Sequence, residues 1–374
     1  MSYKRLGDYI QQVNVRNRDL EDLPLVGLSI TKEFIPSIAN TIGTDMSTYR
    51  IIERNQFAYG PVTSRNGDKI TIALFDAYDK ALISQAYIPF KVKETNELNP
   101  EYLMMWFRRQ EFDRYARFKS HGSAREIFDW KEMCEVELPV PPIEKQREIV
   151  SQYQAVTNKI KVNEQICEKL EATAQAIYKE WFVDGRKGED IVLLSEYVQM
   201  NPKLSLPKGR ICTYIEMANL SENTMSINGK IQREYNGGSR FQNSDTLLAR
   251  ITPCLENGKT AFVNILDKEE IASGSTEFIV MRAKKDVSPF WVYCLARDEN
   301  FRTYAISSMV GSSGRQRVHE KYIEDFKLPE VKKERMEGFD RVVRSTFGTV
   351  KLKSDENQIL TEFQAALLSK MSTI

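Results

Sequence analysis

The feature of this 374-residue chain that most constrains its fold is a repeat of about half its own length. Matching residues in the two halves stand at offsets from 188 to 191: Leu6 with Leu194, Asn66 with Asn257, Arg108 with Arg297, Gly122 with Gly311, and Leu138 with Leu328. Chance does not produce a series of collinear matches at a nearly constant offset. The repeat therefore predicts two related domains, one in each half of the chain.

Each copy combines strand-like and helix-like segments. Residues 70–75 and 246–251 are rich in β-branched and aliphatic side chains, which favour strands. Residues 101–118 and 290–306 are each expected to form a helical piece, and each copy opens with a short helix-like segment. We therefore expect an α+β fold in which two α/β domains form an internal repeat with an approximate two-fold axis.

A long helix is predicted between the domains, over residues 144–183. Pro141-Pro142 blocks helix formation before it, and no Gly or Pro interrupts it. Its apolar positions alternate at spacings of three and four, as in a coiled coil. The predicted seam contains Ile149, Val156, Ile160, Asn163, Leu170, Ile177 and Trp181. Asn163 is expected to be a buried amide that fixes register; a solvated polar residue is the alternative.

A second long helix is expected over residues 332–374, with Leu360 and Leu367 on its seam. Gly348 weakens its middle by roughly 1 kcal/mol relative to Ala. A helix of this length needs a partner for its apolar stripe, and the first long helix is the obvious one. The predicted organisation is domain 1 over 1–143, a helix over 144–183, domain 2 over 184–331, and a helix over 332–374, with the helices antiparallel.

Charge and cysteine content narrow the class of protein. The 53 basic and 52 acidic residues leave a net charge of +1, which argues against a general polyanion binder. No apolar segment is long enough to span a membrane, and no signal peptide is evident. Five scattered cysteines indicate reduced thiols in a cytoplasmic protein, and two histidines without a Cys-x-x-Cys predict no metal site.

Basic residues nevertheless gather at the same place in both copies, in residues 108–125 and 297–321. Both stretches contain a Gly-Ser loop followed by arginine, which suits contacts to DNA phosphates. The candidates for such contacts are Lys119, Ser120, Gly122, Ser123 and Arg125 in the first copy, and Ser312, Ser313, Arg315 and Arg317 in the second. An ordinary solvated face is the alternative interpretation.

Base reading requires side chains that present paired donors or acceptors in a groove. Candidates lie where the two copies differ, as two unlike stretches of DNA would demand. They are Tyr59, Arg65, Asn66, Ser84, Gln85 and Tyr87 in the first copy, and Arg240, Arg250, Asn257, Lys259, Ser275 and Arg317 in the second. For each residue taken singly, an ordinary turn or surface position is the alternative.

Motifs for chemistry are weak. Asn99-Pro100-Glu101-Tyr102 is similar to the Asn-Pro-Pro-Tyr loop of amino-methyltransferases, but it lacks the second proline and no Gly-rich cofactor loop precedes it. Its counterpart, Ser288-Pro289-Phe290, is explained more simply as the start of a helix. No Gly-x-x-x-x-Gly-Lys-Ser/Thr motif for a nucleotide motor occurs. We therefore expect no catalytic residue in this chain.

The whole sequence resembles the specificity (S) subunits of type I restriction–modification systems. Residues 137–150 (ELPVPPIEKQREIV) and 178–184 (YKEWFVD) are similar to the two ends of that family's central helix. Residues 245–259 (DTLLARITPCLENGK) resemble a stretch of its target-recognition domains, and loops ending at Arg125 and Arg315 are typical of it. Residues 330–332 (EVK) depart from the fuller proline pattern, so the start of the distal helix is less well defined.

This resemblance implies a non-catalytic, sequence-specific DNA-binding subunit. Its two target-recognition domains would read a bipartite, asymmetric site in double-stranded DNA. Two modification (methyltransferase) subunits and two restriction (motor-nuclease) subunits would join it, and S-adenosylmethionine, ATP and Mg²⁺ would bind to those partners. The alternative is a coiled-coil interaction scaffold that does not bind DNA, which the near-neutral charge favours.

Overall fold

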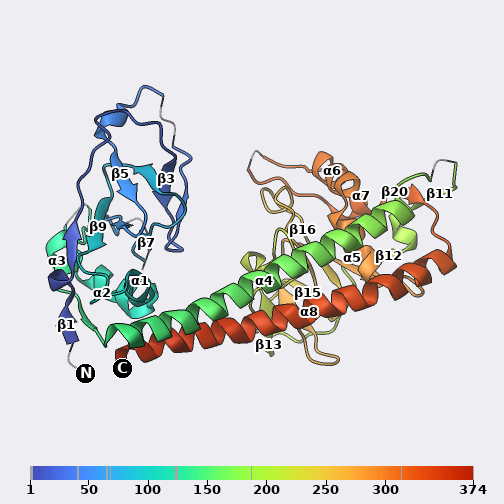
Figure 1. Cartoon of the computed structure of the whole chain (residues 1–374). Helices are drawn as coiled ribbons and strands as arrows, with labels where there is room; N and C mark the ends of the chain where they lie inside the picture. The colour runs from blue at the N-terminus through green and yellow to red at the C-terminus, as the bar shows by residue number, and fades with distance from the viewer. Residues whose placement is uncertain are drawn as a thin grey trace. The chain divides into compact units, whose positions relative to one another are not determined.

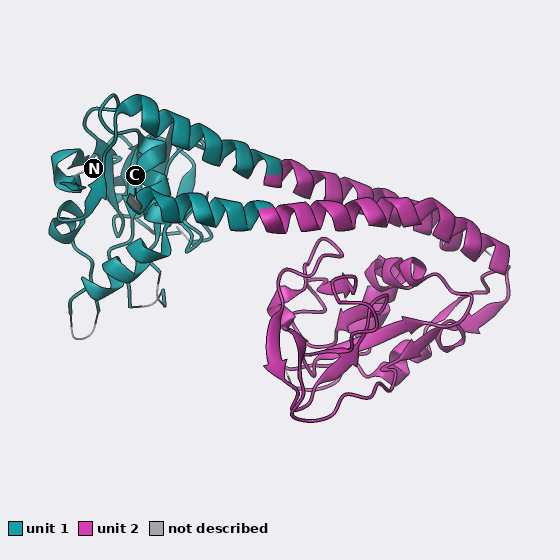
Figure 2. Ribbon diagram, turned by 90° about the horizontal axis from the view of Figure 1, so that it is seen from below, with its two compact units in different colours: residues 1–159, 360–374 teal, residues 160–359 magenta. Residues whose placement is uncertain are grey.

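The computed structural model describes residues 3–39, 42–64, 66–67, 69–122, 125–186, 188–312 and 314–373. The chain divides into two compact units: Met1–Lys159 with Leu360–Ile374, and Ile160–Ile359 (Figure 2). The boundary falls inside both long helices, so each unit holds one α/β domain and a part of each helix. No helix in the described ranges has an apolar stretch long enough to cross a bilayer.

The two long helices are α4, Ile143–Phe182, and α8, Lys333–Lys370 (Figure 1). Gly185 follows α4 with a φ of +70°, the left-handed backbone that commonly ends a helix. The predicted pair of long helices is therefore confirmed.

Within each unit the two helices pack together along their apolar faces. In unit 2, Asn163 of α4 donates to Oδ1 of Asn357 (2.8 Å), and Arg335 donates to the carbonyl of Trp181 (3.3 Å). As the numbers rise along α4 they fall along α8, so the helices are antiparallel there. Among the predicted seam residues Ile149, Val156 and Asn163 are buried, and the rest are half-buried: Ile160, Leu170, Ile177, Trp181, Leu360 and Leu367.

The domain of unit 1 contains two four-stranded sheets and one short strand pair. The sheet next to the helices has the order β2-β9-β6-β7, the outer sheet has the order β4-β3-β8-β5, and β1 pairs with β10. The strands are β1 Tyr3–Arg5, β2 Ile10–Gln12, β3 Leu25–Leu28, β4 Phe34–Pro36, β5 Arg50–Glu53, β6 Phe57–Tyr59, β7 Ile72–Leu74, β8 Lys80–Ile83, β9 Ile88–Val92 and β10 Glu137–Pro139. The short helices are α1 Pro100–Arg108, α2 Gln110–Phe118 and α3 Trp130–Cys134.

The domain of unit 2 repeats this arrangement strand by strand and α-helix by α-helix. Its sheets have the orders β12-β19-β16-β17 and β14-β13-β18-β15, and β11 pairs with β20. The strands are β11 Ile191–Leu193, β12 Val198–Met200, β13 Ile211–Ile215, β14 Ile231–Glu234, β15 Ser239–Phe241, β16 Thr246–Ala249, β17 Thr260–Phe262, β18 Ala272–Gly274, β19 Phe278–Ala283 and β20 Lys327–Pro329. The short helices are α5 Pro289–Arg297, α6 Glu299–Ser307 and α7 Glu320–Glu324. The predicted duplication is confirmed, down to one parallel strand pair in each outer sheet (β3 with β8, β13 with β18).

Two local predictions are wrong. The single helical pieces expected over 101–118 and 290–306 are each two helices, because Arg109 and Asp298 adopt extended backbone (ψ 143° and 138°). Asp298 accepts hydrogen bonds from the N–H groups of Asn300 and Phe301, and so begins α6 as an N-cap. The opening helix-like segment of each copy is a short strand followed by a single 3-10 turn.

Candidate nucleic-acid interface

Both domains present a glycine–arginine loop built in the same way. In the first, His121 bridges to Ile127, which also bridges to Val62. In the second, Val310 bridges to Arg317, which also bridges to Ile251. The two loops therefore close on equivalent three-stranded bridges.

A glycine with left-handed backbone begins each loop. Gly122 has a φ of +135° and Gly311 a φ of +136°. A Cβ at Gly122 would lie 2.2 Å from the carbonyl oxygen of Arg125, and one at Gly311 would lie 3.0 Å from that of Arg315. The glycines thus permit a tight loop whose arginine is exposed. Of the predicted loop serines, Ser312 is exposed, whereas Ser123 and Ser313 lie outside the described residues.

Ion pairs neutralise much of the nearby positive charge. Arg117 pairs with Glu126, Lys119 lies 3.5 Å from Glu132, and Arg317 binds Glu277 through three hydrogen bonds of 2.7–3.0 Å. The hydrogen bonds from Arg317 lower the pKa of Glu277. By contrast, neither the Arg125 nor the Arg315 side chain has an ion-pair partner among the described residues. These two exposed loop arginines are therefore candidates to bind an external anion.

The first domain brings only some of its predicted base-reading residues to the surface. Ser84 and Gln85 lie on the turn between β8 and β9, where Gln85 is exposed. Tyr87 is half-buried, and its hydroxyl accepts a hydrogen bond from the N–H of Leu28 (3.5 Å).

Three other predictions for this domain have different outcomes. The Asn66 side chain donates to the carbonyl of Val62 (3.2 Å) and thereby closes its own turn. Arg65 lies outside the described residues. Tyr59 is 0% exposed, so its assignment as a base-contacting residue is wrong: it belongs to the strand Phe57–Tyr59, which is buried throughout. Ser120, from the predicted phosphate set, donates to the carbonyl of Ala116 (2.7 Å).

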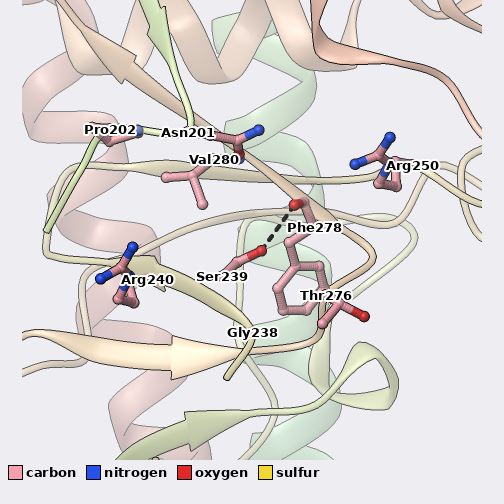
Figure 3. Close-up of a pocket in the computed structure, with 9 residues that line it drawn as sticks. All are labelled: Asn201, Pro202, Gly238, Ser239, Arg240, Arg250, Thr276, Phe278 and Val280. Carbon is pink, nitrogen blue, oxygen red and sulfur yellow. Dashed lines mark hydrogen bonds between the residues drawn. The ribbon is translucent and has the colours of Figure 1, made fainter. Parts of the chain in front are cut away.

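In the second domain, Arg240 and Arg250 line one pocket of ≈ 290 Å³ (Figure 3). Ser275 lies beside it, and its hydroxyl accepts from the N–H of Glu277 (3.1 Å). Lys259 donates instead to the carbonyl of Met217 (3.2 Å), and the exposed Asn257 lies 3.5 Å from the carboxylate of Glu222. Those last two side chains therefore tie one loop to another, away from the pocket.

Sequence reasoning missed two residues of this region. Arg50 of β5 donates to the carbonyl of Tyr87 (2.6 Å), and Glu277 holds Arg317. Neither stands in a motif or a charge cluster. A residue-by-residue alignment of the two halves is the signal that would have drawn attention to Arg50.

The tetrapeptide Asn99-Pro100-Glu101-Tyr102, which is similar to a methyltransferase loop, forms the start of helix α1. The Asn99 side chain accepts hydrogen bonds from the N–H groups of Glu101 (2.8 Å) and Tyr102 (3.1 Å), and Pro100 is the first residue of α1. This is the usual geometry of an N-cap. In the described part of the chain, no three His, Cys, Asp or Glu side chains are grouped so as to hold a metal ion.

Comparison with known proteins agrees with this geometry. Residues 32–172 match the family described as the type I restriction modification DNA specificity domain. The chain is 27% identical over 154 residues to the type I restriction enzyme EcoEI specificity subunit of Escherichia coli, a match that covers 38% of this chain and 25% of that protein. It is 35% identical over 94 residues to the EcoAI specificity subunit of the same species, covering 25% of this chain and 16% of that protein. The matches thus span a quarter or less of the length of these relatives.

A solved structure is similar over nearly the whole chain. The crystal structure of a type I restriction–modification S subunit from M. genitalium matches 99% of this chain and 96% of its own, with a TM-score of 0.58 and 11% sequence identity. At that identity the likeness concerns the fold. The second domain lies outside the family match, and its kinship with the first rests on the repeated topology. The chain is thus similar to the specificity (S) subunits of type I restriction–modification systems, and its residues 32–172 match their DNA specificity domain.

Proposed function

We propose that this chain is the DNA-recognition subunit of a type I restriction–modification complex and carries no catalytic residue of its own. Each α/β domain would read one part of a bipartite, asymmetric site in double-stranded DNA. The observation that carries the proposal is that two domains of identical strand order present the same glycine–arginine loop but different side chains beside it. Residues shared by the two domains are suited to contact the DNA phosphate backbone, which is the same in every DNA sequence. Residues that differ between the domains are suited to contact the bases.

The long helices would hold the partner subunits. Exposed apolar side chains follow one face of α8 within unit 2, where Leu352 is 69% exposed and Ile359 is 67% exposed. A helical surface of this kind is suited to another protein. Because the repeat offers similar surfaces twice, two modification subunits are the expected stoichiometry, with two restriction subunits added for cleavage. S-adenosylmethionine, ATP and Mg²⁺ would then serve those partners, which would methylate adenine and cut DNA.

The same exposed helix surface also favours the alternative, an interaction scaffold without DNA binding. An electrophoretic mobility shift separates the two functions, with the full chain assembled with its modification subunit on a duplex carrying the methylated motif of the host. Retardation that depends on this chain and on the motif supports DNA recognition. No retardation of either duplex would favour the scaffold, and equal retardation of a scrambled duplex would contradict sequence recognition.

A further inference from the structure

The pocket shared by Arg240 and Arg250 has a floor of buried apolar groups and a rim of hydrogen-bond donors (Figure 3). Phe278 and Val280 are each 1% exposed and form part of its lining. The residues that line it, all of them described, include no carboxylate. Such a lining offers hydrogen-bond donors to a ligand that presents acceptors.

The positive charge of this rim is only partly offset. Arg250 forms an ion pair with Glu320 at 3.7 Å and also interacts electrostatically with Glu277, but its buried Nε has no hydrogen-bond partner among the described atoms. The carboxylate of Glu277, next to the pocket, is already occupied by Arg317. No ion pair is found for Arg240 in the described part of the chain. At least one guanidinium can therefore offer its donors to a ligand.

Arg250 is fixed beside the glycine–arginine loop. Its carbonyl accepts a hydrogen bond of 2.9 Å from Val318, and the neighbouring Ile251 bridges to Arg317, on the strand that closes the loop of Arg315. The pocket and the candidate phosphate-binding loop thus belong to one continuous surface of the second domain.

The repeat shows what the first domain has at the same places. Arg240 pairs with Ser273 on β18, and Ile51 pairs with Leu82 on β8, so Ile51 is the equivalent of Arg240. Ile51 is buried, at 5% exposed.

Pro61 is the equivalent of Arg250. Its carbonyl accepts from the N–H of Phe128 (2.8 Å), as that of Arg250 accepts from Val318. Both rim arginines are therefore absent from the first domain.

A third difference between the two domains concerns Ser239, which lines the pocket next to Arg240. Ser239 of β15 donates to the carbonyl of Phe278 (3.0 Å), and its equivalent Arg50 donates to the carbonyl of Tyr87, the equivalent of Phe278 (2.6 Å). A short side chain leaves this place open in the second domain, whereas a long guanidinium side chain occupies it in the first. The same fold has thus been given two different surfaces at one position.

We propose that this pocket reads a guanine in the part of the DNA site bound by the second domain, with Arg240 as its principal donor and Arg250 as its support. The inference rests on the proposed function and names the base class that this domain recognises. Contacts to phosphates should recur in both domains, as the loop arginines do, whereas contacts to bases must differ. Guanine is the base whose major-groove edge presents two acceptors, O6 and N7, that match the forked donors of arginine.

The test is a selection from duplexes with a randomised site, using the full chain assembled with its modification subunit. Arg240→Ala and Arg240→Lys should each abolish the preference for guanine at one position of the second part of the site, a change on the order of ten-fold in relative affinity. Ser239→Arg, which gives the pocket the residue that the first domain tolerates there, should do the same. The first part of the site should be unchanged in all three variants.

Arg233→Ala is the matched control, because Arg233 lies on β14, the opposite edge strand of the same sheet, against the ring of Tyr214 (4.7 Å). It removes the same charge and should keep the full preference. If Arg240→Ala weakens binding to every duplex equally and the guanine preference remains, the guanine assignment is wrong. It is also wrong if the variant changes neither affinity nor preference. Failure of the unaltered complex to enrich any duplex would instead refute the proposed function.

Discussion

The hydroxyl of Tyr293 donates a hydrogen bond of 2.6 Å to the carboxylate of Glu171, a buried side chain of the long helix α4. The backbone N–H of Met225 donates to both oxygens of the same carboxylate, at 2.8 and 2.9 Å. Glu171 thereby joins the helix to two separate parts of the second domain. A buried carboxylate with this set of donors is an anchor whose loss can be measured.

Tyr293→Phe should lower the free energy of unfolding by about 1–3 kcal/mol, because it removes one donor from a buried charged acceptor. Tyr304→Phe is the control, since its hydroxyl makes an exposed hydrogen bond to the carbonyl of Tyr322 (2.9 Å). Chemical denaturation of both variants makes the comparison. Equal losses in the two would show that the Glu171 contact has no special weight.

The stability of the fold should also depend on pH through Glu171. Burial raises the pKa of its carboxyl above the ordinary 4.5, although the hydrogen bonds from Tyr293 and Met225 oppose the rise. The folded chain therefore holds this proton more tightly than the unfolded chain does. Its contribution to stability is complete below pH 4.5 and is lost as the pH rises through the folded-state pKa.

The glutamine of a Glu171→Gln variant cannot ionise, so the variant should not lose stability as the pH rises through the pKa of Glu171. The difference in unfolding free energy, wild type minus variant, should fall as the pH rises from 4.5 and then level off. Denaturation curves at several pH values measure it, with the exposed Glu168→Gln as the control for a lost charge. A difference that stayed constant, or that rose with pH, would contradict the buried-carboxylate account.

Asn163 and Asn357 should be energetically coupled across the helix pair. Asn163 is 0% exposed and its amide donates to Asn357 over 2.8 Å and to Glu356 over 3.0 Å, so Asn163→Leu removes a shared donor from two polar groups and should cost about 1–3 kcal/mol. The double variant with Asn357→Leu should recover part of that loss. If the losses of the two single variants sum to that of the double variant within about 0.5 kcal/mol, the two amides are not energetically coupled.

The loop arginines should contribute to the salt dependence of DNA binding. Arg125→Ala and Arg315→Ala should each reduce the slope of log affinity against log salt concentration by about 0.9, the value of one phosphate contact. Arg233→Ala again controls for lost charge within the second domain. Slopes identical to that of the unaltered complex would remove these residues from the DNA interface.

Some parts of the fold could be predicted from the sequence alone and others could not. The repeat and the long helices were predictable, because collinear matches and a three–four apolar spacing are properties of the sequence itself. The division of each domain into two sheets was not, because pairs such as Leu25 with Leu82 join segments far apart in the chain. Only one of the two helix breaks could have been predicted from the sequence. Asp298 is a residue type that favours the N-cap position, whereas Arg109 is not.

Candidate site residues were harder to predict than the fold. Tyr59 looked like a loop residue until the pairing of its strand showed that it is buried. Glu171 resembles the other glutamates of α4 in the sequence, and only the packing of α5 against the helix distinguishes it. The difference between Arg50 and Ser239 gains meaning from strand register, which places them at equivalent positions.

The most direct test of the account is sequencing of methylated adenine in the genome of the host, with the gene for this chain intact, deleted, or carrying Arg240→Ala. We predict one bipartite, asymmetric motif that disappears on deletion and that loses a guanine only in its second part in the variant. A motif that survives the deletion would contradict the central claim that this chain selects the sequence.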